Sequence, residues 1–230
     1  DFNRIAKAGF NTIRLPVRWA TRAGADAPYT IDPAFMKRVK SVVADARKAG
    51  LNVILNSHHF EDLHKDPSPA NIARLAGMWK QIAAEFANQP EAHLWFEIEN
   101  EPHEKFNDGN LLDVLDPALA EIRKTNPTRA VIIGGEFWSG INSLKMLKLP
   151  DDPNIVPTFH YYDPFDFTHQ GATWVDPVPA FGRVYGTEED KQRLADDVQK
   201  VRDYMARTGN TPFMGEFGAN GPIPLADALR

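Results

Sequence analysis

Two glutamates in this sequence stand at positions where acid–base chemistry can take place. Glu101 follows the apolar run LWFEIEN, and Glu216 ends the run TPFMGE, so each carboxyl lies at the end of a predicted strand. Two carboxyls on separate strands can share the cleavage of a glycosidic bond, because one protonates the leaving oxygen while the other attacks the sugar or activates water. The pair therefore predicts acid-assisted cleavage between sugars.

Other polar and aromatic side chains follow the same strands. In a parallel α/β architecture, the residues at the carboxyl ends of the strands form the active site. The candidates at these ends are Arg14, His58, His59, Asn100, Glu136, Trp138, His160 and Tyr162. Flat apolar faces for sugar rings are expected from Trp19, Phe60, Trp138, Tyr162 and Trp174. Together with the two carboxyls, this set favours carbohydrate chemistry.

The acidic residues before Glu101 leave an ambiguity. Glu97, Glu99 and Glu101 alternate with a period of two, so all three share one face if the strand runs regularly. We expect Glu97 to pair with a basic residue such as Arg14 inside a barrel, and we assign no role to Glu99. Glu136 is expected to serve structure or subsite polarity and not catalysis.

The histidines offer a competing interpretation as a metal site. Imidazole and carboxylate groups are common zinc ligands, and the candidates are His58, His59, His160 and His169 with a glutamate. Adjacent histidines on an extended segment are expected to point to opposite sides, and the sequence has no H-x-H or H-E-x-x-H spacing. We therefore predict neither a metal nor a cofactor, and a metal-dependent hydrolase remains an open alternative.

The elements that must position these residues form an alternating α/β pattern. Short β-branched strands are centred near Ile13, Ile54, Phe96, Ile132, Pro157 and Met214. Helices are predicted from Phe2, from Asp32 to Gly50, from Ile72 to Phe86, over 111–125 and 139–148, and from Thr187 to Gly209. We expect the apolar stripes of these helices, including Leu194, Val198, Val201 and Met205, in the core. The irregular stretch 163–186 is predicted to be a functional loop.

Composition narrows the class of protein further. The chain has 230 residues without a linker or low-complexity tract, which predicts a single domain over residues 1–230. Its net charge of −5 disfavours nucleic acid or an anionic membrane surface as a partner. No apolar run approaches the roughly 18 residues of a membrane span. Because there is no cysteine, disulfides, cysteine-ligated zinc and a thiol nucleophile are excluded.

Five motifs in order resemble those of glycoside hydrolase family 5, the cellulases and related β-glycanases on a TIM barrel. They are GFNTIRLPVRW, ILNSHHFEDL, LWFEIENEPH, FHYYDPFDFTHQGATW and PFMGEFGA. The resemblance implies an α/β fold of the (β/α)8 TIM-barrel type and a retaining hydrolase. Its carboxyl groups would lie about 5 to 5.5 Å apart, against about 6.5 to 9.5 Å in inverting enzymes.

The resemblance also implies roles for individual residues. Glu101 would be the acid/base and Glu216 the nucleophile. Asn100 would hold the sugar 2-hydroxyl, and Arg14 and Tyr162 would keep the nucleophile ionised and oriented. The substrate-contacting side chains would be His58, His59, His160 and His169, with the aromatic faces of Trp138 and Trp174 beside them.

The expected activity is hydrolysis of internal β-1,4 bonds of glucan by a secreted monomer that binds β-glucan or a related polysaccharide. A β-mannanase, a β-1,3-glucanase and a non-catalytic carbohydrate-binding barrel remain alternatives. A complete barrel has eight strands in about 250 residues, whereas six are predicted here. We therefore expect a partial barrel of about six βα units, from a longer protein, without the first strand and the last strand region. Its open sheet edges would invite aggregation.

Overall fold

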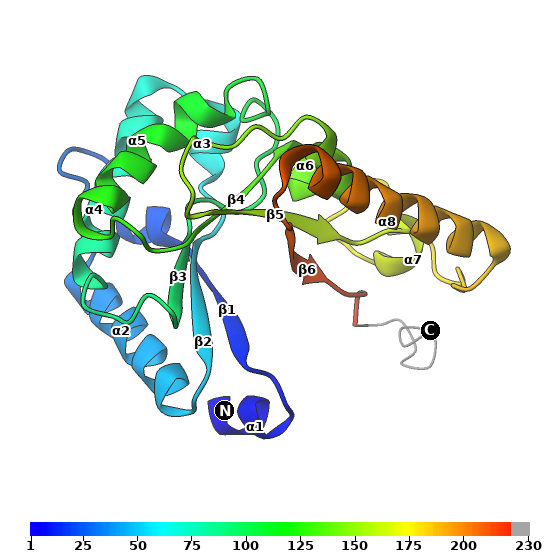
Figure 1. Ribbon diagram of the computed structural model, residues 1–230, viewed down its shortest axis with the longest axis horizontal. Helices are drawn as coiled ribbons and strands as arrows, with labels where there is room; N and C mark the ends of the chain where they lie inside the picture. The colour runs from blue at the N-terminus through cyan, green and yellow to red at the C-terminus, as the bar shows by residue number, and fades with distance from the viewer. Residues whose placement is uncertain (222–230) are drawn as a thin grey trace.

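The computed structural model describes residues 1–221, in which six parallel strands form one sheet in sequential order (Figure 1). The strands are β1 (Thr12–Val17), β2 (Asn52–Ser57), β3 (Leu94–Glu97), β4 (Val131–Gly134), β5 (Ile155–Tyr161) and β6 (Phe213–Phe217). Each strand pairs in parallel with the next. All six predicted strands are confirmed, and the described residues form an incomplete (β/α)8 barrel.

Helices connect the strands and cover the sheet. They are α1 (Phe2–Lys7), α2 (Pro33–Lys48), α3 (Glu61–Lys65), α4 (Pro69–Glu85), α5 (Leu111–Thr125), α6 (Glu136–Ser139), α7 (Phe165–Thr168) and α8 (Glu188–Thr208), with 3₁₀ turns η1 (Trp19–Arg22) and η2 (Ile141–Lys145). In Figure 1, α2, α4 and α5 lie along one side of the sheet, and α8 follows the loop after β5. None of the helices within residues 1–221 has both the length and the apolar character needed to cross a membrane.

The ends of the predicted helices follow from local capping. The carboxyl of Asp32 accepts a hydrogen bond of 2.7 Å from the Ala34 amide, which starts α2. Thr187 and Asp190 form the predicted capping box at the start of α8, and Gly209 ends this helix in the left-handed conformation. The helix predicted over 139–148 is only the turn η2, preceded by left-handed residues at 137–139.

The core lies between the sheet and the helices α4 and α5. The indole of Trp79 is fully buried, packs 5.2 Å from the Phe96 ring and donates a hydrogen bond to the Ile98 carbonyl. Leu75, Ile82 and Phe86 of the predicted apolar stripe are also buried, whereas Ile72 is half-buried. Burial of each such large side chain stabilises the fold by roughly 1.5–3 kcal/mol. This packing makes the first four strands a rigid support for the residues that follow them.

The predicted burial of the α8 stripe is wrong for most of its side chains. Leu194 is 42% exposed, and Val198 and Met205 are each 39% exposed. β6 is the last strand of the sheet, and no described element packs over this side of α8. Phe217, at the end of this edge strand, is 71% exposed. The described residues therefore present an apolar face beside the edge strand.

Candidate active site

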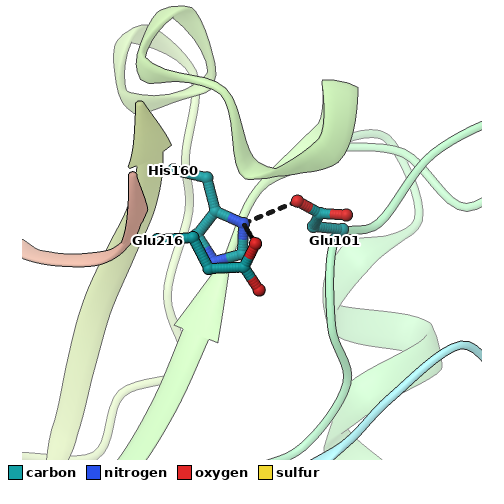
Figure 2. A group of neighbouring side chains, drawn as sticks. All are labelled: Glu101, His160 and Glu216. Carbon is teal, nitrogen blue, oxygen red and sulfur yellow. Dashed lines mark hydrogen bonds and ion pairs between the residues drawn. The ribbon is translucent and has the colours of Figure 1, made fainter. Parts of the chain in front are cut away.

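The two glutamates singled out in the sequence meet at the carboxyl end of the sheet. One carboxylate oxygen of Glu101, one of Glu216 and one ring nitrogen of His160 all lie within 4.8 Å of one another. Nδ1 of His160 lies 2.7 Å from Glu101 Oε1 and 3.7 Å from Glu216 Oε2. Figure 2 shows these three side chains facing one another, with dashed lines marking the contacts. The loop after β3, the strand β5 and the strand β6 each supply one member. The arrangement can therefore place two acidic groups on one small substrate.

Arg14, on β1, holds this group of side chains together. Its Nε and a terminal nitrogen donate to the two oxygens of Glu97 at 2.7 and 2.6 Å, which confirms the predicted pair. The guanidinium also donates to Glu216 and, at 2.6 Å, to the amide oxygen of Asn100. The planar fork of arginine suits several acceptors at once. One cation thereby fixes Glu216 relative to the strand β3.

The surroundings of Glu216 favour its ionised form. Burial alone would raise the pKa of this carboxyl, but His160, Arg14 and Tyr162 outweigh burial and lower the pKa below its ordinary value. The Tyr162 hydroxyl donates to Glu216 at 2.8 Å. Burial and the same hydrogen bond raise the pKa of Tyr162, which keeps its proton and remains a donor. Glu216 is thus an oriented carboxylate whose ionised form is favoured.

Glu101 has a different environment, because the regular strand ends before it. β3 stops at Glu97, and Glu101 adopts a left-handed backbone with φ of +53°. The prediction that Glu97, Glu99 and Glu101 share one face of a regular strand is therefore wrong, because the strand ends at Glu97. The Glu99 carboxyl is buried under the loop after β2. The Glu101 carboxyl faces His160 and is only slightly exposed, with 14% side-chain accessibility.

The adjacent histidines 58 and 59 are not arranged as predicted. His59 has a φ of +57°, and the two rings contact each other with centroids 4.1 Å apart instead of pointing to opposite sides. Burial, with His59 and Arg14 nearby, lowers the pKa of His58 to about 4. A cleft of about 410 Å³ beside Glu216 is lined by Arg14, Pro16, His58, Tyr162, Gly215, Glu216 and Phe217. His58 therefore faces this cleft as a neutral ring.

The aromatic candidates divide into exposed and buried residues. Trp138 is 54% and Trp174 is 71% exposed, so both indoles are free to contact a ligand. Trp19 and Phe60 are buried in the core, so their prediction as sugar-binding faces is wrong. His169 is half-buried, and its ring lies 5.4 Å from Tyr162 and 6.4 Å from Trp174.

Sequence reasoning missed His103, which lies at this end of the sheet behind Trp138. The two rings are stacked, with centroids 5.0 Å apart and an interplanar angle of 13°. His103 stands two positions beyond Glu101 in the motif ENEPH, so it is not itself a strand-end residue. Its place in a segment rich in polar residues was the one signal available.

Glu101, His160 and Glu216 also have the spacing of a possible metal site. In this structure, His160 is hydrogen bonded to Glu101, while Glu216 accepts from Arg14 and Tyr162. A guanidinium bound to one of the carboxylates disfavours a second cation at the same place. These three residues are therefore better suited to exchanging protons with one another or with a substrate than to binding a metal ion.

Comparison with known proteins gives a consistent group of relatives. The family model described as cellulase, glycosyl hydrolase family 5, matches residues 1–225. Endoglucanase H of Acetivibrio thermocellus is 41% identical over 94% of this chain, and the chain spans 23% of the length of that relative. Endoglucanase C of the same organism is 30% identical over 99% of this chain and 75% of its own length.

Solved structures extend the comparison to the fold. The endoglucanase of the hyperthermophilic Thermotoga maritima superposes with a TM-score of 0.94 at 38% identity, covering 99% of this chain and 74% of that chain. A structure of the T. maritima protein in complex with a mannotriose substrate has the same TM-score and identity.

Proposed function

We propose a function for this chain from one established premise: it belongs to the cellulase family, glycosyl hydrolase family 5. The function is hydrolysis of internal β-1,4 bonds of glucan with retention of anomeric configuration. The observation that carries the proposal is the approach of carboxylate oxygens of Glu101 and Glu216 to within 4.8 Å. This approach supports retention, because inverting enzymes separate their carboxyl groups by about 6.5–9.5 Å to admit a water.

In the first step, Glu216 is the nucleophile. Its ionised oxygen forms a bond to the anomeric carbon while the bond from that carbon to the leaving oxygen breaks. Glu101, as the acid, transfers its proton to the leaving oxygen, so that a neutral hydroxyl departs. The lowered pKa of Glu216 supports this assignment, since the nucleophile must carry its charge before substrate binds.

In the second step, Glu101 is the base. It removes a proton from water, the water oxygen bonds to the anomeric carbon, and Glu216 leaves as a carboxylate. His160 contacts both glutamates, at 2.7 Å and 3.7 Å, so it can keep Glu101 oriented as that residue changes its protonation state.

Substrate contacts come from the residues around the two carboxyls. Asn100 is assigned to the sugar 2-hydroxyl, since its amide oxygen is held by Arg14 while its buried Nδ2 has no partner among residues 1–221. The sugar rings lie against the aromatic faces, and the histidines supply hydrogen bonds. The residues assigned to these further contacts are His58, His59, Trp138, His169 and Trp174. Arg14 and Tyr162 are assigned an indirect role, because both donate hydrogen bonds to Glu216.

A pair of variants tests the proposal. Glu216→Gln removes the nucleophile and is expected to lower kcat on carboxymethyl cellulose by at least about a thousandfold, because covalent catalysis is lost. Glu121→Gln, on the distant helix α5, is the matched control and should retain wild-type activity. The anomeric form of the first product, followed by NMR, reports retention directly. A product of inverted configuration, or unchanged turnover by Glu216→Gln, would contradict the proposal.

A β-mannan is a second candidate substrate. It is favoured because the T. maritima relative was solved with mannotriose. Glucose and mannose differ at one hydroxyl, and a site that hydrogen bonds a particular hydroxyl can reject the other sugar. Comparing reducing-end release from carboxymethyl cellulose and from mannan decides between them. Binding to either polymer without any release would instead identify a non-catalytic carbohydrate-binding barrel.

The proposal includes the setting of this activity. Residues 1–230 are assigned to one catalytic domain. Because polymeric glucan does not enter cells, the enzyme is expected to act outside the cytoplasm. Detection of the native protein in culture medium, compared with a cytoplasmic marker, tests this location.

A further inference from the structure

A buried group of polar side chains behind the proposed acid/base has no place in the mechanism above. Glu99, His64 and His103 are 3%, 0% and 8% exposed, respectively. Glu99 accepts hydrogen bonds from the Ser57 hydroxyl at 2.7 Å and from the Phe60 amide at 2.9 Å. Buried polar networks cost free energy unless all their members are paired, so a set of this kind needs a structural reason.

The group forms a continuous chain of contacts that ends on Glu101. Glu99 Oε1 lies 3.2 Å from Nε2 of His64, and Nδ1 of His64 lies 3.0 Å from Nδ1 of His103. Nδ1 of His103 then lies 2.6 Å from the carbonyl oxygen of Glu101. A carbonyl only accepts hydrogen bonds, so His103 must carry its proton on Nδ1. Glu99 Oε1 already accepts from the Phe60 amide, so its contact with His64 places a proton on Nε2 of His64. Nδ1 of His64 is then an acceptor, and the Nδ1 proton of His103 is shared between it and the Glu101 carbonyl.

The contact between His103 and the Glu101 carbonyl falls on a strained residue of the backbone. Glu101 has a φ of +53°, which is unfavourable for a residue with a Cβ and persists only where neighbours hold it. The same loop is tied to α3, because the amides of Lys105 and Phe106 donate to the His64 carbonyl at 3.1 and 3.3 Å. His64 thus anchors the loop through its backbone and through its ring.

The same histidine also supports an aromatic face of the site. His103 stacks on Trp138, and the Trp138 amide donates to the Pro102 carbonyl at 3.1 Å. Trp138 is itself left-handed, with a φ of +55°. His103 therefore contacts two residues of the proposed site, the acid/base and a sugar-binding indole, without reaching the substrate position itself.

We propose that Glu99, His64 and His103 are positioning residues that fix the backbone of Glu101 and the indole of Trp138. This inference rests on the proposed function, since it assigns these side chains to the orientation of its acid/base. A misplacement of about 1 Å at a reacting group can cost about a hundredfold in rate. Loss of the contacts among Glu99, His64 and His103 should thus lower the rate at which Glu101 donates its proton, while the nucleophile is unaffected.

The first test separates the two roles of His103 in the full chain. His103→Phe keeps a flat ring against Trp138 but cannot donate to Glu101, so we expect kcat on cellotetraose to fall about 10- to 100-fold with KM unchanged. His103→Ala also removes the stack, and KM should rise as well. A wild-type kcat in His103→Phe would overturn the inference.

The second test uses leaving groups that differ in their need for a proton. Glu99→Gln should lower kcat/KM on cellotetraose by about tenfold or more, because that leaving group must be protonated. On dinitrophenyl cellobioside, whose leaving group departs without a proton, the loss should stay below about threefold. The basic limb of the pH profile on cellotetraose should also change. Glu121→Gln is the matched control. Equal losses on both substrates would indicate a general loosening and would overturn the inference.

Nitrogen-15 NMR of the wild-type histidines distinguishes failure of this inference from failure of the proposed function. We expect His103 to be protonated at Nδ1 and His64 at Nε2, whether or not the chain hydrolyses any sugar. A neutral His103 protonated only at Nε2 would overturn this inference, because that ring could not donate to the Glu101 carbonyl. A wild-type chain that shows the expected protonation but releases no sugar from either substrate would overturn the hydrolase proposal instead.

Discussion

At the scale of single residues, the proposed mechanism needs one carboxyl, Glu216, to act as a base-like nucleophile and the other, Glu101, to act as an acid at the same pH. One positive side chain, Arg14, reaches Glu97 and Glu216. Within residues 1–221, the hydrogen-bond partner of the Glu101 carboxyl is instead His160. The two carboxyls thus have different partners although they lie within 4.8 Å of each other. Environments that differ in this way are how two chemically identical groups acquire opposite roles.

Removal of the Tyr162 hydroxyl tests how the charge on Glu216 is maintained. In Tyr162→Phe the carboxylate loses a hydrogen bond of 2.8 Å that lowers its pKa, so this pKa should rise. Because the nucleophile is active only when ionised, the acidic limb of kcat/KM should move to higher pH. Tyr161→Phe is the control, since that hydroxyl bonds Asp197 and not the site. An unchanged acidic limb in Tyr162→Phe would contradict this account.

His58 offers a second pH test. Its pKa of about 4 means that the ring stays neutral at pH 6, which histidine NMR can follow. The unfolded chain binds this proton near pH 6.5. The free energy of unfolding should therefore fall as the pH decreases from about 6.5 to 4. His58→Asn should reduce this dependence in urea titrations, and a dependence as steep as that of the wild type would refute the assignment.

At the scale of elements, β6 can approach β5 closely because residue 215 has no side chain. A Cβ at Gly215 would lie 2.8 Å from Thr158 Oγ1 and 3.0 Å from His160 Nε2. His160 is the residue that contacts both glutamates, so any displacement of its ring reaches the proposed chemistry directly.

Gly215→Ala should therefore impair both stability and activity. We expect the free energy of unfolding to fall by about 1–3 kcal/mol through overpacking, and kcat/KM to fall by about tenfold or more through displacement of His160. Gly24→Ala is the control, since its Cβ would meet nothing closer than 3.7 Å. Urea unfolding and a reducing-end assay measure the two effects. An active Gly215→Ala variant of wild-type stability would show that His160 tolerates the shift.

The elements were more predictable from the sequence than the fine geometry of the site. Strands and capped helices follow from local patterns, and Asp32 and Thr187 form caps where predicted. The contact between the rings of His58 and His59 could not be predicted, because it depends on a left-handed φ that tertiary packing imposes. The partners of Glu99 were also hidden, since they come from the loop and helix that follow a different strand.

At the scale of the whole molecule, burial depends on which neighbours are present. The α8 stripe has the same helical period as the buried stripe of α4, but Leu194 and Val198 remain exposed because no described element covers them. Periodicity alone therefore predicts which face of a helix is apolar but does not establish that this face is buried. The monomeric state remains a prediction.

The exposed face of α8 makes a measurable prediction about association. Apolar patches on a sheet edge and its covering helix promote self-association. The double variant Leu194→Lys and Val198→Glu should reduce the concentration dependence of light scattering by the 230-residue chain, while hydrolysis is unchanged. Gln199→Lys, at an exposed position of the same helix outside the apolar stripe, is the control. Equal scattering by the double variant and the wild type would exclude this face as the contact.

The bonds of Arg14 have one more consequence for the molecule. This side chain joins β1 to Glu97 on β3 and to Glu216 on β6, so a single guanidinium connects the first, a middle and the last strand of the sheet. A cut in the exposed loop near Gly182 would leave Arg14 and Glu101 on one piece and Glu216 on the other. Neither piece alone would hold the complete reacting pair. Sugar release from a mixture of the two halves would then report their reassembly, which makes this protein a candidate for a split-enzyme sensor.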